Sequence, residues 1–355
     1  MKALSVLIVN SHIPWGGLGQ FTLSLAQGLK SEGYEVHGLV THSDEDNFNA
    51  FKHLTSTTTY VGNLGKLAKY IAVLKLLWKL KPDVTLINYN AVIHFLLPFI
   101  PKSRVIDIIH NDVEDFYRIS KINHHYVNAW VAPTPGIKEG YIKYAGLPRA
   151  KNDTVVISHG ISQSKTVRPA YNETELNLAF VGAVYEHKGA DMLPQIMEKI
   201  LAVVPYAKLR IIGSGKLESA LKSEFESKGM SKSIEFMGVI PHEGVRETLA
   251  QSDILLFPTR VEAFGLVIAE AMMEGAVPVV TLLPGITDAT VENGETGYLI
   301  SKDDVETFAK KVIDLARDRN LLVSMSNRCK IAAQEHLSLS TMGRNYRDLI
   351  EKMSN

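Results

Sequence analysis

The sequence is poor in cysteine, because Cys329 is the only one among its 355 residues. A single thiol excludes a disulfide within the chain and is typical of proteins in a reducing compartment. Cys329 lies in a polar stretch that we expect to be helical, and no catalytic signature surrounds it. We therefore interpret it as incidental rather than as a nucleophile.

The sequence also lacks an excess of charge of either sign. Its 38 lysines and arginines balance its 38 aspartates and glutamates, so the formal net charge is zero. This balance gives no support to a nucleic-acid-binding protein, which usually carries a basic excess. The hydrophobic fraction of 46% is that of an ordinary globular protein.

Long apolar runs are absent as well. The N-terminal apolar run is too short for a secretory signal, and no small-residue cleavage site follows it. The most apolar later stretch, Ala91–Ile100, contains His94 and Pro98. It is about half as long as a membrane-spanning helix must be. We therefore expect a cytoplasmic protein without a transmembrane segment.

Short β-branched runs alternate with longer amphipathic segments along the whole chain. This alternation is typical of parallel sheets covered by helices on both faces, which predicts an α/β fold. The length exceeds the usual size of one domain, and each half has enough strands for its own doubly wound sheet. The expected strands are Leu4–Val9, Val36–Val40, Val84–Asn88, Arg104–Ile109, Ala129–Ala132, Thr154–Ile157, Leu176–Val181, Lys208–Ile212, Ser233–Met237, Ile254–Phe257 and Val277–Val280.

We place the domain boundary in the stretch Ser158–Thr174, which is polar, contains Pro169 and lacks periodicity. The prediction is an N-terminal Rossmann-like domain over residues 1–164 and a C-terminal Rossmann-like domain over residues 165–338.

The last segment, Thr341–Lys352, has the pattern of a helix that follows a small polar break at Ser338 and Ser340. Residues 339–355 would then form a C-terminal helix. This helix could cap the second domain or cross back to the first.

The most specific stretch is PTRVEAFGLVIAEAMMEG, residues Pro258–Gly275. The strand Ile254–Phe257 ends in a loop that begins with proline, a helix opens near Phe264–Gly265, and Gly275 ends it. The first amides of such a helix are free, and amide donors together with the helix dipole stabilise a bound diphosphate. The amides concerned are those of Gly265, Leu266 and Val267.

Two glutamates flank this helix start. Glu262 comes just before the helix, so it would lie near the group that is attached to the bound diphosphate. Glu270 lies on the first turns of the helix. A carboxylate at the second position can accept hydrogen bonds from both hydroxyls of a nucleotide ribose. The alternative is a surface helix with two solvated glutamates. The strand, loop and glycine around the pair favour the binding site.

The stretch Glu262–Glu270 resembles the E-x7-E motif of the retaining glycosyltransferases of family 4, which have the GT-B fold. The resemblance is strong from Leu178 to Ile300 and looser in the first half. It implies two facing Rossmann-like domains with an active site in the cleft between them. By this resemblance the domain over residues 1–164 lies on the acceptor side, and the domain over residues 165–338 binds the nucleotide sugar. It also implies that Glu262 lies beside the donor sugar and that Glu270 holds the ribose. Other segments similar to the family's pattern are Ala276–Val280, Pro284–Gly285 and Glu292–Ile300.

The segment VGAVYEHKG, residues Val181–Gly189, follows a strand and resembles the family's phosphate-binding loop. That loop usually carries an arginine and a lysine. Lys188 fills the lysine position and would neutralise the diphosphate as a point charge, the alternative being a solvated loop lysine. The arginine position holds Ala183, which departs from the family. Either the leaving group is stabilised less here, or Arg260 in the adjacent loop substitutes.

The segment HIPWGGLGQ, residues His12–Gln20, joins the first strand to a helix expected from Phe21. Its glycines allow the backbone to approach a ligand closely, although a tight turn would use them equally well. The spacing is not G-x-G-x-x-G and no acidic residue follows the second strand, which argues against a dinucleotide site. The resemblance places Gly16 and Gly17 in the loop that faces the donor phosphates.

His110 ends the strand Arg104–Ile109, and ligand sites of α/β proteins form at the carboxyl ends of parallel strands. A lone histidine is more often structural or solvated. The resemblance favours a functional role, because a histidine after the corresponding strand contacts the donor sugar in the family. No comparable context surrounds His124, His125 or His159.

Neither a spaced cluster of metal ligands nor a D-x-D pair suited to a nucleotide-bound divalent ion is present in the sequence. We therefore expect a metal-independent reaction with no cofactor, in which the sugar nucleotide is the donor substrate.

The stretch LGKLAKYIAVLKLLWKLK, residues Leu64–Lys81, is helical in period and basic on one side. One interpretation is a domain helix with a solvated lysine face. The other is a helix that docks on anionic lipid, since many relatives glycosylate lipid-linked acceptors. The second would place the protein peripherally at the inner face of the membrane.

Together with the resemblance, these observations predict a transferase that moves a hexose from UDP-glucose or a close analogue to a glycan or lipid-linked glycan, in polysaccharide biosynthesis. The resemblance implies retention of the anomeric configuration. Lys188 and the helix amides would hold the leaving diphosphate while it accepts the proton of the acceptor. Glu262 and His110 would orient the sugar. Two alternatives stay open: a GT-B sugar-nucleotide epimerase, and a catalytically silent sugar-nucleotide-binding protein, which Ala183 favours.

Overall fold

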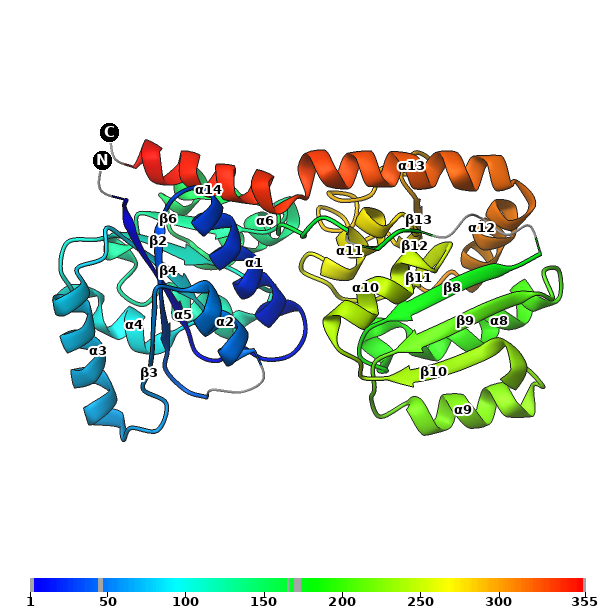
Figure 1. Ribbon diagram of the computed structural model, residues 1–355, viewed down its shortest axis with the longest axis horizontal. Helices are drawn as coiled ribbons and strands as arrows, with labels where there is room; N and C mark the ends of the chain where they lie inside the picture. Colours follow the sequence, from blue (N-terminus) through cyan, green and yellow to red (C-terminus); the bar gives the residue numbers. More distant parts are fainter. Residues whose placement is uncertain (1–2, 44–46, 165, 169–173, 354–355) are drawn as a thin grey trace. The chain divides into compact units, whose positions relative to one another are not determined.

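The computed structural model describes residues 3–43, 47–164, 166–168 and 174–353 (Figure 1). The chain divides into two compact units, and each has its own parallel sheet. Unit 1 consists of Met1–Ser162 and Leu337–Asn355, and unit 2 of Gln163–His336. The division falls two residues before the boundary expected from the sequence.

Unit 1 is built on seven parallel strands in the order β3-β2-β1-β4-β5-β6-β7. Six of them were expected, each within one residue of its observed ends. The strand that the sequence did not reveal is β3, a four-residue edge strand of partly exposed threonines and one tyrosine that has no apolar run. The strands are β1 (Ser5–Asn10), β2 (Glu35–Val40), β3 (Thr57–Tyr60), β4 (Val84–Asn88), β5 (Arg104–Ile108), β6 (Ala129–Ala132) and β7 (Thr154–Val156).

The helices of unit 1 connect these strands and cover the sheet (Figure 1). They are α1 (Gly17–Ser31), α2 (Phe48–Leu54), α3 (Lys66–Leu80), α4 (Ala91–Leu96), η1 (Leu97–Phe99), α5 (Glu114–Ser120), η2 (His124–Tyr126), α6 (Pro135–Ala145) and α7 (Ala150–Asp153).

Unit 2 is built on six parallel strands in the order β10-β9-β8-β11-β12-β13. Five of them were expected within one residue of their observed ends, and the short edge strand β13 was not. Its strands are β8 (Leu176–Val181), β9 (Ala207–Ile212), β10 (Ile234–Gly238), β11 (Ile254–Phe257), β12 (Val277–Thr281) and β13 (Tyr298–Ile300). Its helices are η3 (Glu186–Lys188), η4 (Ala190–Met192), α8 (Leu193–Leu201), α9 (Glu218–Ser227), η5 (Ser231–Ser233), α10 (His242–Ala250), α11 (Leu266–Glu274), α12 (Val305–Arg317) and α13 (Arg319–His336).

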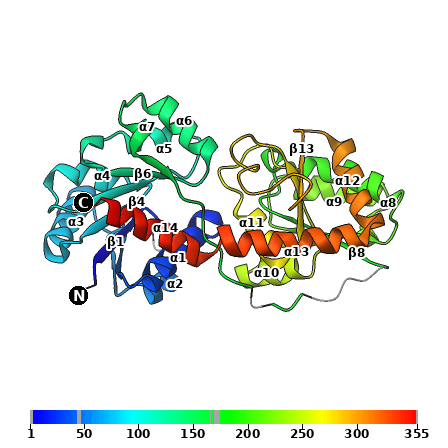
Figure 2. The same cartoon turned by 90° about the horizontal axis from the view of Figure 1, so that it is seen from above.

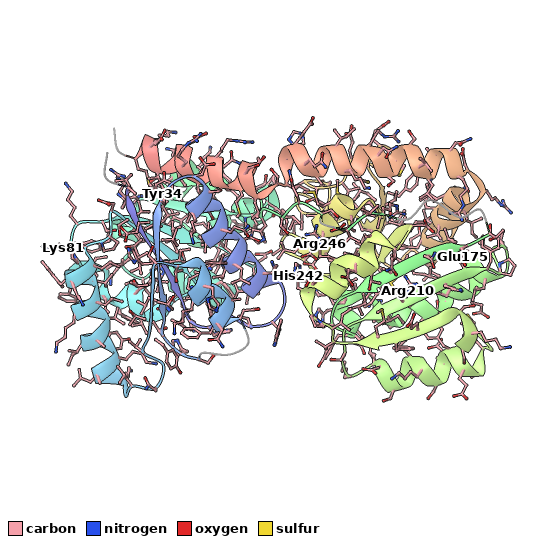
Figure 3. The ribbon with its side chains drawn as sticks, in the orientation of Figure 1. Tyr34, Lys81, Glu175, Arg210, His242 and Arg246 are labelled. Atoms are coloured by element: carbon pink, nitrogen blue, oxygen red, sulfur yellow. The ribbon has the colours of Figure 1, made fainter. Side chains whose placement is uncertain are left out.

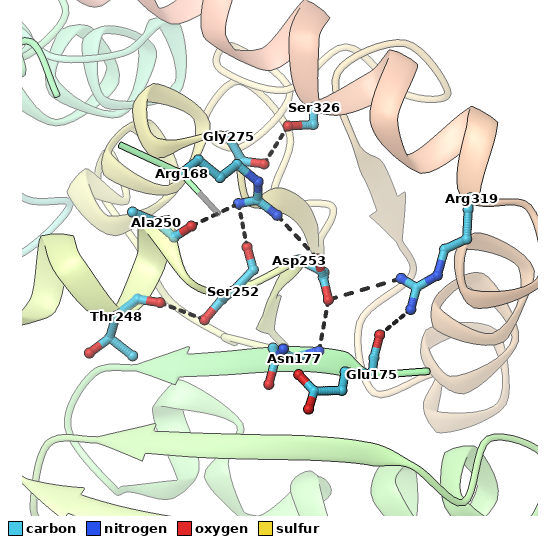
Figure 4. A network of polar contacts seen from close by, with 10 residues as sticks. All are labelled: Arg168, Glu175, Asn177, Thr248, Ala250, Ser252, Asp253, Gly275, Arg319 and Ser326. Atoms are coloured by element: carbon cyan, nitrogen blue, oxygen red, sulfur yellow. Dashed lines mark hydrogen bonds and ion pairs between the residues drawn. The ribbon is translucent and has the colours of Figure 1, made fainter. Parts of the chain in front are cut away.

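A buried polar network anchors the start of unit 2 to its sheet (Figure 4). Arg168 donates to the Ser252 carbonyl at 2.6 Å and to Asp253 at 3.2 Å. Asp253 also accepts from the Asn177 amide at 2.8 Å and lies 3.9 Å from Arg319. Two guanidinium groups therefore compensate one buried carboxylate, as a buried charge requires. Pro169 and the other residues of the expected linker at 165 and 170–173 lie outside the described residues.

The C-terminal helix α14 (Leu339–Lys352) packs on α1 (Figure 2). Ser338 caps it by accepting a hydrogen bond from the Thr341 amide at 3.2 Å. Ser340 therefore lies inside the helix, and the polar break expected at this residue is wrong. The two helices meet at Gly343, where a Cβ would lie 2.9 Å from a carbonyl of α1. Arg347 adds an ion pair at 2.6 Å to Glu32, the C-cap of α1.

Cys329 lies on a helix as expected, on the buried side of α13. Its thiol donates to the Thr296 carbonyl at 2.8 Å. Burial raises the pKa of the Cys329 thiol to about 12, so the thiolate is not populated near neutral pH. Its structural setting is that of a core side chain.

The hydroxyl of Tyr346 on α14 gives a test of the packing of unit 1. Tyr346 is 1% exposed, and its hydroxyl has no hydrogen-bond partner among the described residues. Tyr346→Phe should keep the free energy of unfolding or raise it by about 1 kcal/mol, because it removes an unpaired polar group. Tyr346→Ala should lower it by about 3 to 5 kcal/mol through cavity formation.

Urea unfolding of the full chain measures both changes. Asn345→Ala, on the exposed side of the same helix, is the matched control and should change little. A loss of more than about 1 kcal/mol in Tyr346→Phe would show that the hydroxyl has a partner that stabilises the fold.

Candidate functional site

The helix start predicted after β11 is present in unit 2. Gly265 is the N-cap of α11 with a positive φ of 76°, and Leu266 is the first helical residue. The first amides of a helix have no acceptor within it, so Leu266 and Val267 present donors at the positive end of the helix dipole. Gly275, with φ 83°, ends the helix as predicted. Such a terminus binds anions.

Lys188 and Glu262 form an ion pair between the two loops that follow β8 and β11. The Lys188 ammonium donates to the Glu262 carboxylate, and their side chains are only 21% and 14% exposed. The structure therefore brings together two residues that the sequence placed at the diphosphate and the sugar. Each compensates the charge of the other.

Arg260 is held by carboxylates. Its guanidinium donates two hydrogen bonds to Asp191, at 2.7 and 2.8 Å, and one to Asp303 at 2.6 Å. These hydrogen bonds raise its pKa further above that of a free guanidinium. Ala183, where the family carries arginine, is exposed. The charge that was expected to replace the missing arginine is thus already compensated by two aspartates.

Glu270 is buried and paired with a histidine that the sequence analysis missed. Its carboxylate side chain is 8% exposed and accepts from His242 Nε2 at 2.7 Å. His242 is the first residue of α10 and is labelled in Figure 3. No spacing links His242 to Glu270, because the pair forms only when α10 packs against α11. The alternative of a solvated glutamate on a surface helix is therefore wrong for Glu270.

A glycine allows the two loops to meet. Gly189 has a φ of 71°, and a Cβ there would lie 1.9 Å from the Pro258 carbonyl oxygen. The Arg260 amide donates to the His187 carbonyl at 2.8 Å beside this contact. The phosphate-binding loop expected at Val181–Gly189 therefore packs directly on the loop that leads into α11.

In unit 1, Gly16 and Gly17 lie at the beginning of a helix rather than in a long loop. Helix α1 begins at Gly17, four residues before the expected start at Phe21. Gly16 is its N-cap, with a φ of 95° that other residues rarely adopt. The helix can start early because glycine at the cap reverses the chain directly after Trp15. The amides of the first turn again point out of a helix N-terminus.

His110 lies two residues beyond β5, and β5 ends one residue earlier than expected. The side chain is 6% exposed, and its Nε2 donates to the Asn88 side-chain oxygen. Burial lowers the pKa of His110 to about 4, so the imidazole is neutral near neutral pH. His159, for which the sequence gave no role, lies close by, with ring centroids 6.2 Å apart.

The described residues contain no group of three or more histidine, cysteine, aspartate or glutamate side chains arranged to hold a metal ion. His124 and His125 lie together on η2, away from the strand ends that carry the candidate site.

Two family models match the chain: "Glycosyl transferases group 1" over residues 163–336 and "Glycosyltransferase Family 4" over residues 15–165. The chain is a glycosyltransferase of the family 4 type. The phosphatidylinositol N-acetylglucosaminyltransferase GPI3 subunit of Saccharomyces cerevisiae is 29% identical over 146 residues, which are 41% of this chain and 32% of that protein. A GDP-mannose-dependent phosphatidylinositol monomannoside mannosyltransferase of Corynebacterium glutamicum is 30% identical over 173 residues. These are 46% of this chain and 44% of that protein.

This glycosyltransferase has the GT-B fold. The Anabaena protein HepE in complex with UDP matches it with a TM-score of 0.81 at 14% sequence identity, covering 98% of this chain and 100% of that one. At such low identity the match shows the fold alone. The chain spans less than half the length of the two curated relatives named above.

The loop contact at Gly189 gives a test of the site architecture of this glycosyltransferase. Gly189→Ala should lower the free energy of unfolding by about 1 kcal/mol for the positive φ, and by at least about 2 kcal/mol more for the collision with Pro258. Gly229→Ala is a matched control, because Gly229 has nearly the same φ, 70°, and open space around its Cβ.

The difference between the two unfolding free energies isolates the collision. Equal losses in the two variants would show that the loops are not in contact at Gly189.

Proposed function

We propose that the chain transfers a hexose from UDP-glucose or a close analogue to a hydroxyl of a glycan or lipid-linked glycan, with retention of anomeric configuration, in polysaccharide biosynthesis. The observation that carries the proposal is the free N-terminus of α11, flanked by the Lys188–Glu262 pair and the buried Glu270. The UDP and UDP-glucose complexes of HepE support the choice of donor, since HepE shares the fold.

In unit 2, the proposed roles follow the resemblance to the E-x7-E motif. The diphosphate lies at the N-terminus of α11, where Lys188 supplies a point charge. Glu270 accepts hydrogen bonds from the ribose hydroxyls, and Glu262 orients the sugar. The backbone donors at this end are those of Gly265, Leu266 and Val267, and Phe264 is a further residue of the proposed donor site.

In unit 1, Gly16 and Gly17 offer backbone amides to the donor phosphates, and His110 orients the sugar. Because His110 is neutral near neutral pH, it acts as a hydrogen-bonding group and not as a general acid.

The reaction breaks the bond between the anomeric carbon and the diphosphate and forms one to the acceptor oxygen. The acceptor hydroxyl gives its proton to the leaving phosphate oxygen on the same face of the sugar. Donors at the leaving oxygens help most where negative charge develops, and they are in place before the reaction. None of these steps is routed through a metal ion.

The proposed ribose contact predicts the effect of Glu270→Ala. Loss of a charge-assisted bond should weaken UDP binding by about 1.5 to 3 kcal/mol, which calorimetry measures directly. Glu274→Ala is not a suitable control, because Glu274 is paired with Arg246 in the core. Glu243→Ala, on the first turn of α10, is a suitable one. An unchanged dissociation constant in Glu270→Ala would rule out the ribose assignment.

The diphosphate site predicts the effect of Lys188→Ala, which should lower turnover by roughly a hundredfold or more. Ala183→Arg should tighten UDP binding and steepen its salt dependence, because Arg260 is already neutralised by aspartates.

The predicted metal-independent reaction has its own test. The rates of sugar transfer should be equal with and without EDTA.

The double variant Ala183→Arg with Arg260→Ala tests whether Arg260 also contributes to the diphosphate site. Non-additive effects on UDP affinity would show that the two guanidinium groups act at the same place. A neutral or harmful effect of Ala183→Arg alone would contradict the account of an under-charged site.

We also propose that α3 and η1 dock on an anionic lipid surface. None of the helices that the structure describes has the length and hydropathy needed to span a bilayer. On α3, Leu67, Ile71 and Trp78 form one exposed stripe and are 75%, 45% and 55% exposed. Trp78 donates to the Phe99 carbonyl at 3.0 Å, and Phe99 is itself 63% exposed.

Charge supports the same surface. Residues 47–106 contain eight lysines and arginines and one acidic residue, Asp83, in a chain with no net charge. Exposed aromatic and leucine side chains among lysines are the pattern of interfacial helices, and each lysine near an anionic surface contributes about 1 kcal/mol.

Trp78→Ser should reduce sedimentation of the protein with phosphatidylglycerol vesicles at least about tenfold, and high salt should reduce it too. Val239→Ser is a matched control, because Val239 is a 70% exposed apolar residue of unit 2. Equal binding to neutral and anionic vesicles, or equal loss in both variants, would contradict the proposal.

A further inference from the structure

A buried polar cluster surrounds His110 at the carboxyl edge of the sheet of unit 1. It consists of Asn10 at the end of β1, Asn88 at the end of β4, Thr22 on α1 and His110 after β5. Asn10, Thr22 and Asn88 are each at most 2% exposed. Because Asn10 and Asn88 are register partners in neighbouring strands, the sheet itself places their side chains together.

The hydrogen bonds of this cluster have a defined direction. Thr22 Oγ1 lies 3.0 Å from the Leu18 carbonyl oxygen and 3.3 Å from Asn10 Oδ1, and because both atoms accept, the hydroxyl proton goes to one of them. Thr22 Oγ1 then accepts from Asn88 Nδ2 at 2.9 Å. Asn88 Nδ2 donates its other proton to Asn10 Oδ1, also at 2.9 Å.

The orientation of the Asn88 amide determines the tautomer of His110. With both protons of Nδ2 used, the Asn88 oxygen is the atom that faces His110 Nε2. An amide oxygen only accepts, so Nε2 must carry the proton. In a neutral imidazole the other nitrogen, Nδ1, then has a free lone pair. This Nδ1 forms no hydrogen bond among the residues that the structure describes, and it is not one of the fully buried polar atoms.

The groups around the ring keep it neutral. Burial lowers the pKa of His110 to about 4, and Asp107 opposes this shift only in part. His159, the other titratable group that faces the ring, has its own pKa lowered by burial and by His110. The ring of Phe21 packs against both imidazoles, and its centroid lies 5.1 Å from that of His110 and 4.2 Å from that of His159.

We propose that Asn88 is a positioning residue that holds His110 in the Nε2-protonated tautomer, so that Nδ1 accepts a hydrogen bond from a hydroxyl of the donor sugar. The proposal rests on the proposed function for the identity of that hydroxyl. It makes His110 a hydrogen-bond acceptor that selects for a hydroxyl. A deoxy or O-methyl sugar would leave Nδ1 unpaired, which costs affinity.

The tautomer is measured first, without any ligand. In protein labelled with ¹⁵N-histidine, long-range nitrogen–proton spectra should show His110 with a protonated Nε2 and a bare Nδ1 between about pH 6 and pH 8. The signal is assigned by its loss in His110→Gln. A protonated Nδ1, or averaged signals of two tautomers, would overturn the proposal.

Asn88→Asp tests the positioning role. A carboxylate beside Nε2 raises the pKa of His110, so the imidazole gains a proton on Nδ1 as the pH falls and can no longer accept. For this variant kcat/KM for UDP-glucose should fall on the order of tenfold per pH unit in the acid range, mainly through KM. The wild-type profile should be flat there. Asn128→Asp, at the opposite edge of the same sheet, is the matched control and should keep the wild-type profile.

The two measurements separate the inference from the proposed function. If wild-type protein binds no nucleotide sugar by calorimetry, the proposed function fails whatever the tautomer. If it binds UDP-glucose and Asn88→Asp keeps a flat profile, the positioning role fails. Should Asn88→Asp not fold, the spectrum of the wild type still decides the tautomer.

Discussion

Parallel strand pairing is the constraint on which the candidate site depends. All strands of a parallel sheet end at the same edge, so the loops that follow them converge there whatever their separation in sequence. In unit 1 this places Asn10, Asn88 and His110 together across three strands. In unit 2 it brings the loops after β8 and β11 into contact at Gly189. These side chains are close because the backbone pairing requires it.

Compensation of charge is the second feature of the site in unit 2. Lys188 is paired with Glu262 and Arg260 with two aspartates, while Glu270 is hydrogen-bonded to His242. Partly buried charges need partners, and these pairs hold the side chains in place before a ligand binds. The amides at the start of α11 are different, because helix geometry leaves them without an acceptor. An anionic ligand could therefore accept hydrogen bonds from these amides directly. A paired side chain such as Lys188 would have to contact both the ligand and its present partner.

Hydrophobic pattern predicted most of the fold, and its failures have physical reasons. The buried strand β11 is a continuous apolar run and β4 is mostly apolar, and the sequence located both to the residue. The edge strand β3 has no apolar run, and β13 is only three residues long and partly exposed, so neither stands out in the sequence. The glycine after β11 marked the start of α11, whereas the helix start at Gly17 was hidden by glycines that have low helix propensity.

The candidate site was predicted only where a local motif exists. Lys188, Glu262 and Glu270 were proposed from strand, loop and helix context and from the resemblance to the family, and the structure brings the first two together. His242 and Asn88 could not be found, because each meets its partner through packing of elements far apart in the chain. The partners of Arg260 belong to this class as well, which is why its charge appeared available in the sequence.

Product analysis with radiolabelled UDP-glucose and a mixture of candidate glycan acceptors tests the central claim most directly. The account predicts that label passes from the nucleotide to a glycan with the anomeric configuration of the donor, and that UDP is released in equal amount. Label that stays on the nucleotide, as an epimerised sugar or as unchanged UDP-glucose bound to the protein, would contradict it.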